Sequence, residues 1–541
     1  MIPIIIASLI ILFYYIFTRN YNYWKKRNVV HDTPLPIFGN HFQNAAGLKS
    51  LTNVLTELYY KYPDEKIVGY FKGSQPALVV RDLDIIRDIL NVDFTYFHAR
   101  GAALNPETEP LLKNLFHVDG DIWKLLRKRL TPAFTGTRLK NMFPLISQCA
   151  EKLQALIEDK AKRGEDCDVR NLMSRFTIEF IGACGFGIDM DTICNENSAF
   201  LHLGKVVFQR TGKDVILLGI MDLFPQTRKY IQLADDKLYN LIADIVLTAF
   251  KWRNYKPSGR NDFIDVLLHL SQEGKITGES IEKQNPDGTP ATIELTLDDE
   301  LLVAQVFVFY AAGFETSSFA TSVTLHKLAF HPQIQARAQE EIDEILESYG
   351  GKLCFEAVSK MTYLEMVFKE SMRMFSSFGF LQRVCCQRYT FPSLDLTIDP
   401  GVIVFIPSQA IQIDGKYFEN PSEFRPERFS PESTYHHKYS YMPFGEGPRG
   451  CIGARLGQMQ SLAGLAAILQ KFTVEPSDKT PMELPINPWS NIVQAVKGEI
   501  PLKLKLRKRS TRSDAVSGGT GCYSAEVYRR AFRQNPHGTT Y

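Results

Sequence analysis

The sequence lacks a paired cysteine framework. Its nine cysteines form an odd, scattered set at positions 149, 167, 184, 194, 354, 385, 386, 451 and 522. This excludes a disulfide-stabilised scaffold, and no C-x-x-C spacing marks a zinc or redox site. Charge of one sign is not in excess either, because 62 basic residues face 60 acidic ones. That balance argues against nucleic acid as the main partner, and the cysteine usage indicates a reducing compartment.

Low-complexity linkers and internal repeats are also missing between about residue 45 and residue 505. Hydrophobic residues make up 45% of the 541 positions, which is enough for a large buried core. We therefore expect one domain over 45–506. The stretch 507–541 is basic, then rich in Gly and Ser, and predicts a disordered tail.

Helical periodicity dominates this domain. Helices are expected at 49–62, 82–91, 121–131, 139–163, 171–185, 231–252, 298–328, 332–348, 361–375 and 454–471. The short strand candidates are 66–72, 76–80, 395–398 and 402–406. The polar stretch 271–296 contains several Gly and Pro residues and predicts a surface loop. The fold class is mainly α with small β-sheets (α+β), since the strands are too few for a doubly wound fold.

Residues 2–18 contain no charge and predict an N-terminal transmembrane helix, so that 1–19 forms a membrane anchor. A cleaved signal peptide needs a basic stretch before the apolar run and small residues after it, and neither is present. A core helix is the remaining alternative. Basic residues behind the span keep the body of the chain on the cytosolic face. Residues 20–44 form a basic hinge in which Pro34 and Pro36 favour a stiff, extended spacer.

The densest motif is the stretch 443–453, Pro-Phe-Gly-Glu-Gly-Pro-Arg-Gly-Cys-Ile-Gly, followed by an apolar helix. Residues 445–450 spell G-x-G-x-x-G, and with a strand-like run at 439–444 they imitate a dinucleotide-binding unit. No further βαβ unit follows, however. The second interpretation makes Cys451 an axial thiolate ligand of haem, with Arg449 as counter-charge for a carboxylate. A buried structural cysteine is the third.

The predicted helix 298–328, with Thr296 and Asp299 as its capping box, has an unusual middle. Gly313 and Thr316 both disfavour a regular helix, so their presence in the middle of a predicted helix needs an explanation. Gly313 could clear space for a bound diatomic molecule, while Glu315 and Thr316 deliver protons to it. The alternative is a kinked core helix whose hydroxyl bonds its own backbone.

Two further spacings place charged side chains on one helix face. Glu370 and Arg373 lie three residues apart among apolar neighbours, and Arg428 could complete a buried fork. A solvated surface pair is the alternative. Trp123 and Arg127 lie four residues apart, a geometry that suits a carboxylate clamp.

With these motifs in order, the sequence resembles the cytochrome P450 family of haem-thiolate monooxygenases over residues 1 to about 506. The loop matches F-x-x-G-x-R-x-C-x-G at every fixed position, and W-x-x-x-R, A-G-x-E-T, E-x-x-R and P-E-R-F precede it in the family's order. The apolar anchor and the residues of several motifs are similar to those of insect microsomal enzymes that oxidise plant toxins and insecticides. Family members usually carry proline soon after E-x-x-R, where this chain has Ser376 and Ser377.

The resemblance implies haem b (iron protoporphyrin IX) with a cysteine thiolate axial ligand, and roles for individual residues. Cys451 would be the iron ligand, and Glu315 with Thr316 would activate oxygen. The residues implied at the haem propionates are Trp123, Arg127, Arg383 and Arg449, with Arg100 as a further contact. The other implied cofactor neighbours are Phe444, Gly445, Gly453 and Gly313, and the implied supporting triad is Glu370, Arg373 and Arg428.

The implied function is insertion of one oxygen atom from O2 into an apolar small molecule. The electrons would come from NADPH-cytochrome P450 reductase in the endoplasmic reticulum membrane, with cytochrome b5 as a second candidate donor. Lys124, Lys128 and Arg129 are candidates for the docking face, although a solvated helix face explains them almost as well. Hydrophobic candidates for the substrate pocket are Phe307, Phe380 and Leu381, which core packing would also explain.

Three rival functions stay open. An isomerase or dehydratase on the same haem-thiolate body would need neither O2 nor a reductase. A haem-binding sensor or carrier would not turn over at all. Oxidation of endogenous hormones or lipids is an alternative substrate class.

Overall fold

The computed structural model describes residues 2–102, 107–187, 190–208, 212–233, 236–260, 262–433, 437–490 and 493–507. Met1–Leu506 form one compact unit. The predicted tail 507–541 lies outside the described residues except for Arg507.

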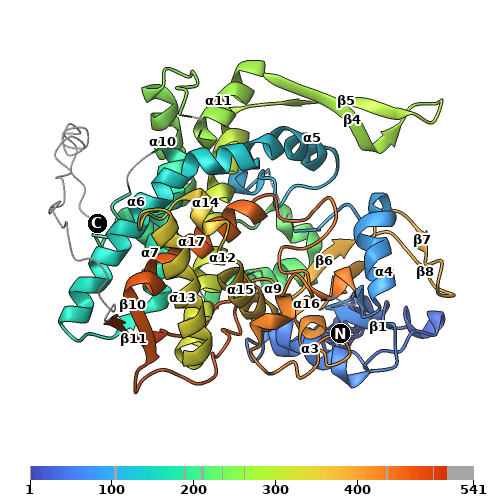
Figure 1. The fold of residues 1–541 in the computed structure, drawn as a ribbon. Coiled ribbons are helices and arrows are strands. Elements are labelled where there is room, and N and C mark those ends of the chain that lie inside the picture. Colours follow the sequence, from blue (N-terminus) through green and yellow to red (C-terminus); the bar gives the residue numbers. More distant parts are fainter. Residues whose placement is uncertain are drawn as a thin grey trace. The chain divides into compact units, whose positions relative to one another are not determined.

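Helices form most of this unit (Figure 1). Their bounds are α1 Ile2–Thr18, α2 Phe42–Ala45, α3 Leu51–Lys61, α4 Leu83–Arg87, α5 Gly120–Leu130, α6 Gly136–Lys162, α7 Val169–Ile181, α8 Ala199–Phe208, α9 Gly212–Leu223, α10 Asp236–Trp252, α11 Phe263–Glu273, α12 Asp299–Ala329, α13 Pro332–Ser348, α14 Phe355–Val358, α15 Thr362–Met374, α16 Ser408–Gln412 and α17 Ala454–Lys471. Each predicted helix is confirmed, with shifts of a few residues at the ends. The expected mixture of many helices and small sheets is therefore confirmed.

The strands form small sheets. Their bounds are β1 Ile67–Lys72, β2 Gln75–Val80, β3 Cys167–Asp168, β4 Lys275–Gln284, β5 Pro290–Thr296, β6 Leu381–Val384, β7 Tyr389–Thr390, β8 Thr397–Ile398, β9 Ile403–Ile406, β10 Phe472–Pro476 and β11 Pro501–Leu506. The largest sheet has the order β1-β2-β9-β6, and a second one has the order β10-β11-β3. In β1-β2-β9-β6 only the β2–β9 pair is parallel, which rules out a doubly wound arrangement.

Helix α12 runs through the core. It is long and apolar enough to span a membrane, but most of it is buried inside the protein, between α7, α15 and α17. The expected capping box is wrong, because the Asp298 carboxylate caps the helix by accepting from the Leu301 amide. A side chain one position before the first helical residue reaches that amide, whereas Thr296 lies too far upstream.

The stretch 271–296 is not a loop but contains the hairpin β4–β5, which projects from the body in Figure 1. Gly288, at φ +82°, lies in the connecting turn, and Ile276 is buried at the base. The Asp121 carboxylate of α5 accepts from the Ser280 hydroxyl at 2.8 Å and the Ile281 amide at 2.7 Å. Bonds to a distant helix thus hold strands whose own sequence is mostly polar.

The N-terminal segment separates into two parts. α1 is apolar on all sides and exposed from Ile2 to Ile16, and its 17 residues are at the short end of what spans a bilayer. The expected extended spacer is instead folded onto the sheet. Trp24 is fully buried and donates to the Tyr70 carbonyl at 3.0 Å, and Gly39 bridges to Lys72. The reason is apolar burial, which outweighs the local stiffness of two prolines.

Candidate haem site around Cys451

Cys451 lies at the end of a glycine-rich loop and three residues before the first residue of α17. Its amide donates to the Phe444 carbonyl at 2.8 Å, which closes the loop on itself. Gly445 and Gly447 have φ of +69° and +76°, and a Cβ at Gly447 would lie 2.0 Å from the Leu90 carbonyl oxygen. Only glycine fits there, because the loop is pressed against the segment that follows α4.

Cys451 retains exposed surface as a residue, although protein groups surround its thiol. Burial raises the pKa of its thiol, while the Gly453 amide and the guanidinium groups of Arg127 and Arg100 act in the opposite direction. An amide donor and two cations around a sulfur favour a bound thiolate over a buried inert cysteine.

The dinucleotide interpretation of this loop is wrong. Residues Lys438–Ser440 form a 3-10 turn, and 441–444 do not continue as a strand. After α17, β10 pairs antiparallel with β11, so no βαβ unit is completed. The glycines form turns and a close contact and do not open a phosphate-binding helix.

Four arginines gather beside the loop, from four separate segments of the chain: Arg100, Arg127, Arg383 and Arg449. Burial and mutual repulsion lower the pKa of Arg449 to about 9, and burial lowers that of Arg100 to about 10. Burial also lowers the pKa of Arg383, again with repulsion from Arg100 and Arg449. The carboxylate of Asp119 opposes these positive charges, and its Oδ1 lies 2.6 Å from Nη2 of Arg449.

Among the described residues, Asp119 is the carboxylate that opposes these four guanidinium groups, so a surplus of positive charge remains in a buried place, which is costly without an anion. The buried Nε of Arg383 has no partner among the described residues. A ligand with two carboxylates next to a thiolate would supply the missing negative charge and acceptors. The residues therefore fit haem, which carries two propionates.

The Arg449 side chain is bound mainly by other groups of the protein. Its guanidinium lies over the Trp123 ring, with 4.2 Å from Cζ to the ring centroid, and donates to the carbonyls of His98 and Val118. Arg100 donates to the Arg449 carbonyl at 2.7 Å. Arg449 thus joins the cysteine loop to the segment 98–119, and its contact with a propionate stays a prediction.

The middle of α12 serves helix packing. A Cβ at Gly313 would lie 2.4 Å from Cδ1 of Ile181, so this glycine lets α7 approach α12 closely. The Thr316 hydroxyl donates to the Ala312 carbonyl at 2.8 Å, as the kinked-helix alternative expects. Ala312 itself is exposed although Ala311 and Phe314 are buried, so this turn is not packed on every face.

Glu315 follows on the same helix and is less exposed than Ala312. Burial raises the pKa of its carboxyl, and Arg170 of α7, 3.8 Å away, opposes the shift. Arg170 also donates to the Val496 carbonyl at 2.7 Å and is partly exposed. The acid is therefore inside the protein but next to a cation that reaches the surface.

Glu370, Arg373 and Arg428 come together as a buried fork. Arg373 Nε donates to Glu370 Oε2 at 2.8 Å, and Arg428 Nε donates to Glu370 Oε1 at 3.2 Å. Arg373 also donates to the Gln412 carbonyl, and the Gln412 side chain accepts from the Met442 amide. This chain of bonds connects α15 to the start of the cysteine loop.

The pocket candidates lie in different surroundings. The Phe378 ring faces Phe116 at 6.3 Å between centroids, which brings the segment before α5 next to the segment before β6. Leu381 lies near Gly445 of the cysteine loop. Phe380 packs edge-on against Phe405, and Phe307 packs against the main core. Packing therefore accounts for Phe380 and Phe307.

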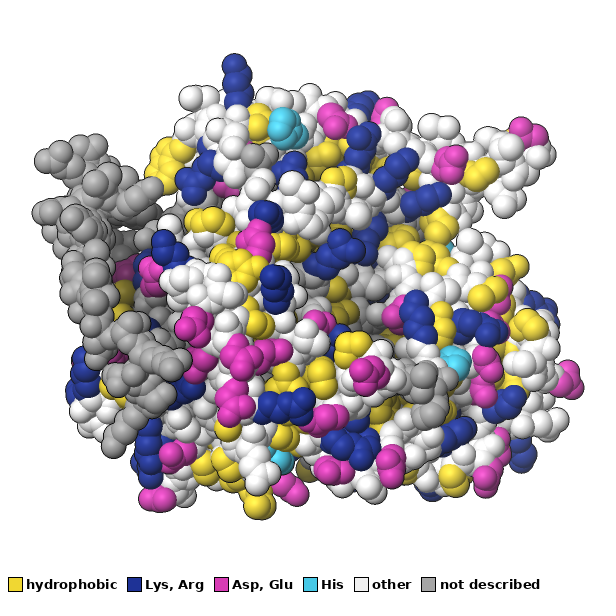
Figure 2. All heavy atoms as spheres, in the orientation of Figure 1, with side chains coloured by type: hydrophobic (Ala, Val, Ile, Leu, Met, Phe, Trp, Pro, Cys, Tyr) yellow, Lys and Arg dark blue, Asp and Glu magenta, His cyan; other side chains and the backbone are white. Residues whose placement is uncertain are grey.

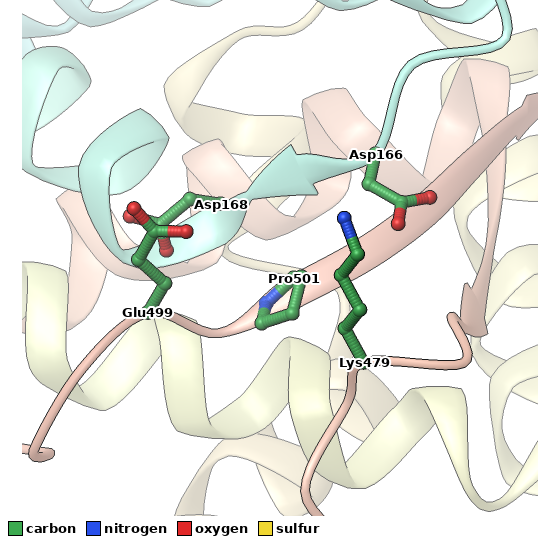
Figure 3. Close-up of a pocket in the computed structure, with 5 residues that line it drawn as sticks. All are labelled: Asp166, Asp168, Lys479, Glu499 and Pro501. Atoms are coloured by element: carbon green, nitrogen blue, oxygen red, sulfur yellow. The ribbon is translucent and has the colours of Figure 1, made fainter.

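A separate hollow lies at the sheet β10-β11-β3, lined by Asp166, Asp168, Lys479, Glu499 and Pro501 (Figure 3). In the close-up the Lys479 ammonium points toward Asp166. Asp168 caps α7 by accepting from the Arg170 amide. The described residues contain no group of three or more His, Cys, Asp or Glu side chains placed to hold a metal ion. Asp168 thus has an ordinary structural role as a helix cap.

Sequence reasoning missed two residues that organise the site. Asp119 accepts from the amides of Arg100 and Gly101 as well as from Arg449. Its place just before α5 suggests only a helix cap. Gln412 joins the fork to the cysteine loop, and no local pattern marks it.

Comparison with known proteins agrees with this geometry. The family profile described as Cytochrome P450 matches residues 31–506. Cytochrome P450 6B2 of Helicoverpa armigera is 37% identical over 507 residues, covering 94% of this chain and 98% of the relative. Cytochrome P450 6a2 of Drosophila melanogaster is 35% identical, covering 90% and 95%. Cytochrome P450 6B1 of Papilio polyxenes is 36% identical, covering 87% and 92%.

Proposed function

The chain belongs to the cytochrome P450 family and is a monooxygenase whose cofactor is haem with a cysteine ligand; from this premise we propose that it oxidises apolar foreign compounds such as plant toxins and insecticides. Electrons would come from NADPH through NADPH-cytochrome P450 reductase, with cytochrome b5 as a second candidate donor. The similarity to insect relatives and the aromatic contact between Phe116 and Phe378 support an apolar substrate.

The site residues take the following roles in this proposal. Cys451 ligates the iron, and Arg100, Arg127 and Arg383 face the propionates. Arg449 and Trp123 hold the cysteine loop against the segment before α5. When bound, haem supplies the centre at which O2 is reduced.

Glu315 and Thr316 handle protons in this proposal, and they are the observation that carries the monooxygenase assignment over an isomerase. The Thr316 hydroxyl already donates to Ala312, so its oxygen lone pairs are left to accept a proton donor. Glu315 has a raised pKa and can hold its proton to higher pH than a surface carboxyl. Two such groups on one turn are what reduction of O2 to water requires.

The partner surface and the membrane element belong to the same proposal. Figure 2 shows Lys and Arg side chains over the part of this face where Figure 1 places α5. Lys124 and Lys128 of α5 would meet an acidic reductase, whereas Arg129 lies 3.4 Å from Glu273 and is partly neutralised. The apolar α1 would anchor the enzyme in the endoplasmic reticulum, with the catalytic domain on the cytosolic face.

The test is turnover of the purified holoenzyme with reductase and NADPH on plant toxins, insecticides, sterols and fatty acids. We expect oxidised products from the first two groups that require both NADPH and reductase. Products formed without them would establish an isomerase or dehydratase. An iron spectrum that none of the compounds perturbs, without turnover, would establish a carrier. Turnover of sterols or fatty acids alone would move the function to endogenous substrates.

A further inference from the structure

The segment Phe375–Phe380, between α15 and β6, is bonded to three different parts of the protein. The Ser376 amide donates to Oε1 of Gln409 on α16 at 2.8 Å. The Ser377 carbonyl accepts from the Gln494 amide in the C-terminal loop at 2.9 Å. The Ser377 hydroxyl donates to the Thr316 carbonyl of α12 at 3.3 Å. Further bonds from Gln494 Nε2 to the Ser376 carbonyl at 2.7 Å and from the Gln409 amide to the Gly379 carbonyl at 2.9 Å also fix the backbone of the segment. The Ser377 hydroxyl joins it to α12.

Ser377 is well buried, and its hydroxyl meets α12 at a functional turn. In an α-helix the Thr316 carbonyl accepts from the amide four residues later, and its second lone pair remains for another donor. The Thr316 hydroxyl donates in turn to Ala312. Thr316 is therefore restrained at both ends, by Ala312 through its hydroxyl and by Ser377 through its carbonyl.

We propose that Ser377 is a positioning residue for Thr316, and that through it the segment Phe375–Phe380 sets the place of the Thr316 hydroxyl. The proposal rests on the proton role proposed above for Thr316. The same segment carries Phe378, which directly follows Ser377 and whose ring faces Phe116. A substrate lying against this ring would act on the Ser377–Thr316 bond.

The neighbouring serine provides a matched control. The Ser376 hydroxyl is completely buried and has no partner among the described residues, while its amide makes the bond to Gln409. S376A therefore removes a buried hydroxyl of the same kind without removing a hydrogen bond. S377A removes the bond to α12, and S377T keeps a hydroxyl at that position.

The first measurement is hydrogen peroxide released per product formed by the holoenzyme with reductase and NADPH. A net hydrogen bond shifts an equilibrium by roughly two- to tenfold, and a bond as long as 3.3 Å belongs at the lower end. We expect S377A to raise this ratio about two- to fivefold, S376A to leave it unchanged, and S377T to restore it. Equal ratios for S377A and S376A would overturn the proposal.

The second measurement needs no turnover. Amide hydrogen exchange of peptides covering the middle of α12 should be faster in S377A by about two- to tenfold, and unchanged in S376A. Unchanged exchange in S377A would also overturn the proposal, because the bond would then not restrain α12.

The variant T316A separates this proposal from the proposed function. If T316A does not raise the peroxide ratio, the proton role of Thr316 fails, whatever the exchange data say about Ser377. If it does, the double variant T316A/S377A should release no more peroxide than T316A alone, since Ser377 then has no hydroxyl to position. An additive increase would show that Ser377 acts by another route.

Discussion

Cys451 combines a raised thiol pKa with neighbours that stabilise its negative charge. In C451S a hydroxyl replaces the thiolate, and a hydroxyl donates far less electron density to iron. We expect the variant to keep part of its haem but to lose the thiolate-type absorption of the reduced CO complex. The matched control is C354S, which changes a partly exposed cysteine remote in sequence from the loop and should leave that spectrum intact. An unaltered spectrum in C451S would remove Cys451 as the ligand.

Glu315 makes the stability of the enzyme depend on pH. Because burial raises its pKa in the folded protein, the folded state binds the proton more tightly than the unfolded state. Its contribution is fully present below the ordinary value of 4.5 and is lost as pH rises through the raised folded value. The glutamine in E315Q cannot ionise. The unfolding free energy of E315Q should therefore increase relative to that of the wild type as pH rises through this window.

Urea unfolding of both proteins at a series of pH values measures this difference. A constant difference between wild type and E315Q over the whole series would show that the Glu315 pKa is not raised. The E315Q variant should also form less product per O2 reduced, because an amide cannot donate a titratable proton.

At the scale of elements, α12 and α7 approach each other through Gly313. In G313A the new Cβ would meet Ile181 Cδ1 at 2.4 Å, so the helices must separate or the side chain must leave its rotamer. We expect a loss of roughly 1–3 kcal/mol in the free energy of unfolding. I181A in the same chain should recover part of this loss, because it removes the clashing atoms while adding its own cavity.

G219A is the control for G313A. Gly219 lies inside α9 with nothing within 4 Å of an added Cβ, so alanine there should stabilise the protein by up to about 1 kcal/mol. If G313A were also neutral or stabilising in urea unfolding, close packing would not be the reason for this glycine.

The sequence predicts these elements with unequal success, and the difference has a physical cause. α12 and α17 are long, largely buried helices and α13 is a long amphipathic one, so their local signal agrees with their tertiary surroundings. In the hairpin β4–β5, the strand β4 carries few apolar residues, although Ala291, Ile293 and Leu295 alternate with polar residues in β5. The hairpin also depends on the Asp121 carboxylate of α5. A bond between residues about 160 positions apart leaves no trace in a local pattern.

The site shows the same division. Cys451, Arg449 and the pair Glu370–Arg373 lie in short motifs whose spacing already fixes their neighbours. The roles of Asp119 and Gln412 come from contacts between segments far apart in the chain. Ser377 appears in the sequence only as a departure from the family's proline, and its partner on α12 becomes visible in the fold.

At the scale of the whole molecule, the buried fork joins α15 to the segment that leads into the cysteine loop. E370Q would leave Arg373 and Arg428 buried without a counter-charge. Breaking such a pair costs about 3–5 kcal/mol, a large part of the roughly 5–15 kcal/mol that stabilises a typical protein. We expect a sharp fall in holoenzyme yield and in the urea midpoint. E158Q, which breaks the exposed Glu158–Lys162 pair, should change neither.

The last prediction concerns α1 and the membrane. Its side chains from Ile2 to Ile16 are exposed, whereas Phe17 packs against Phe224 at 5.4 Å. A helix that is apolar all round is stable in lipid but costly in water. Deleting residues 2–18 should therefore move the enzyme from the carbonate-washed membrane pellet to the supernatant, with its CO spectrum unchanged. Replacing them by a leucine-rich helix of the same length should restore the pellet fraction. If the deleted form stayed in the washed pellet, the attachment would lie in the folded body and α1 would not be the anchor.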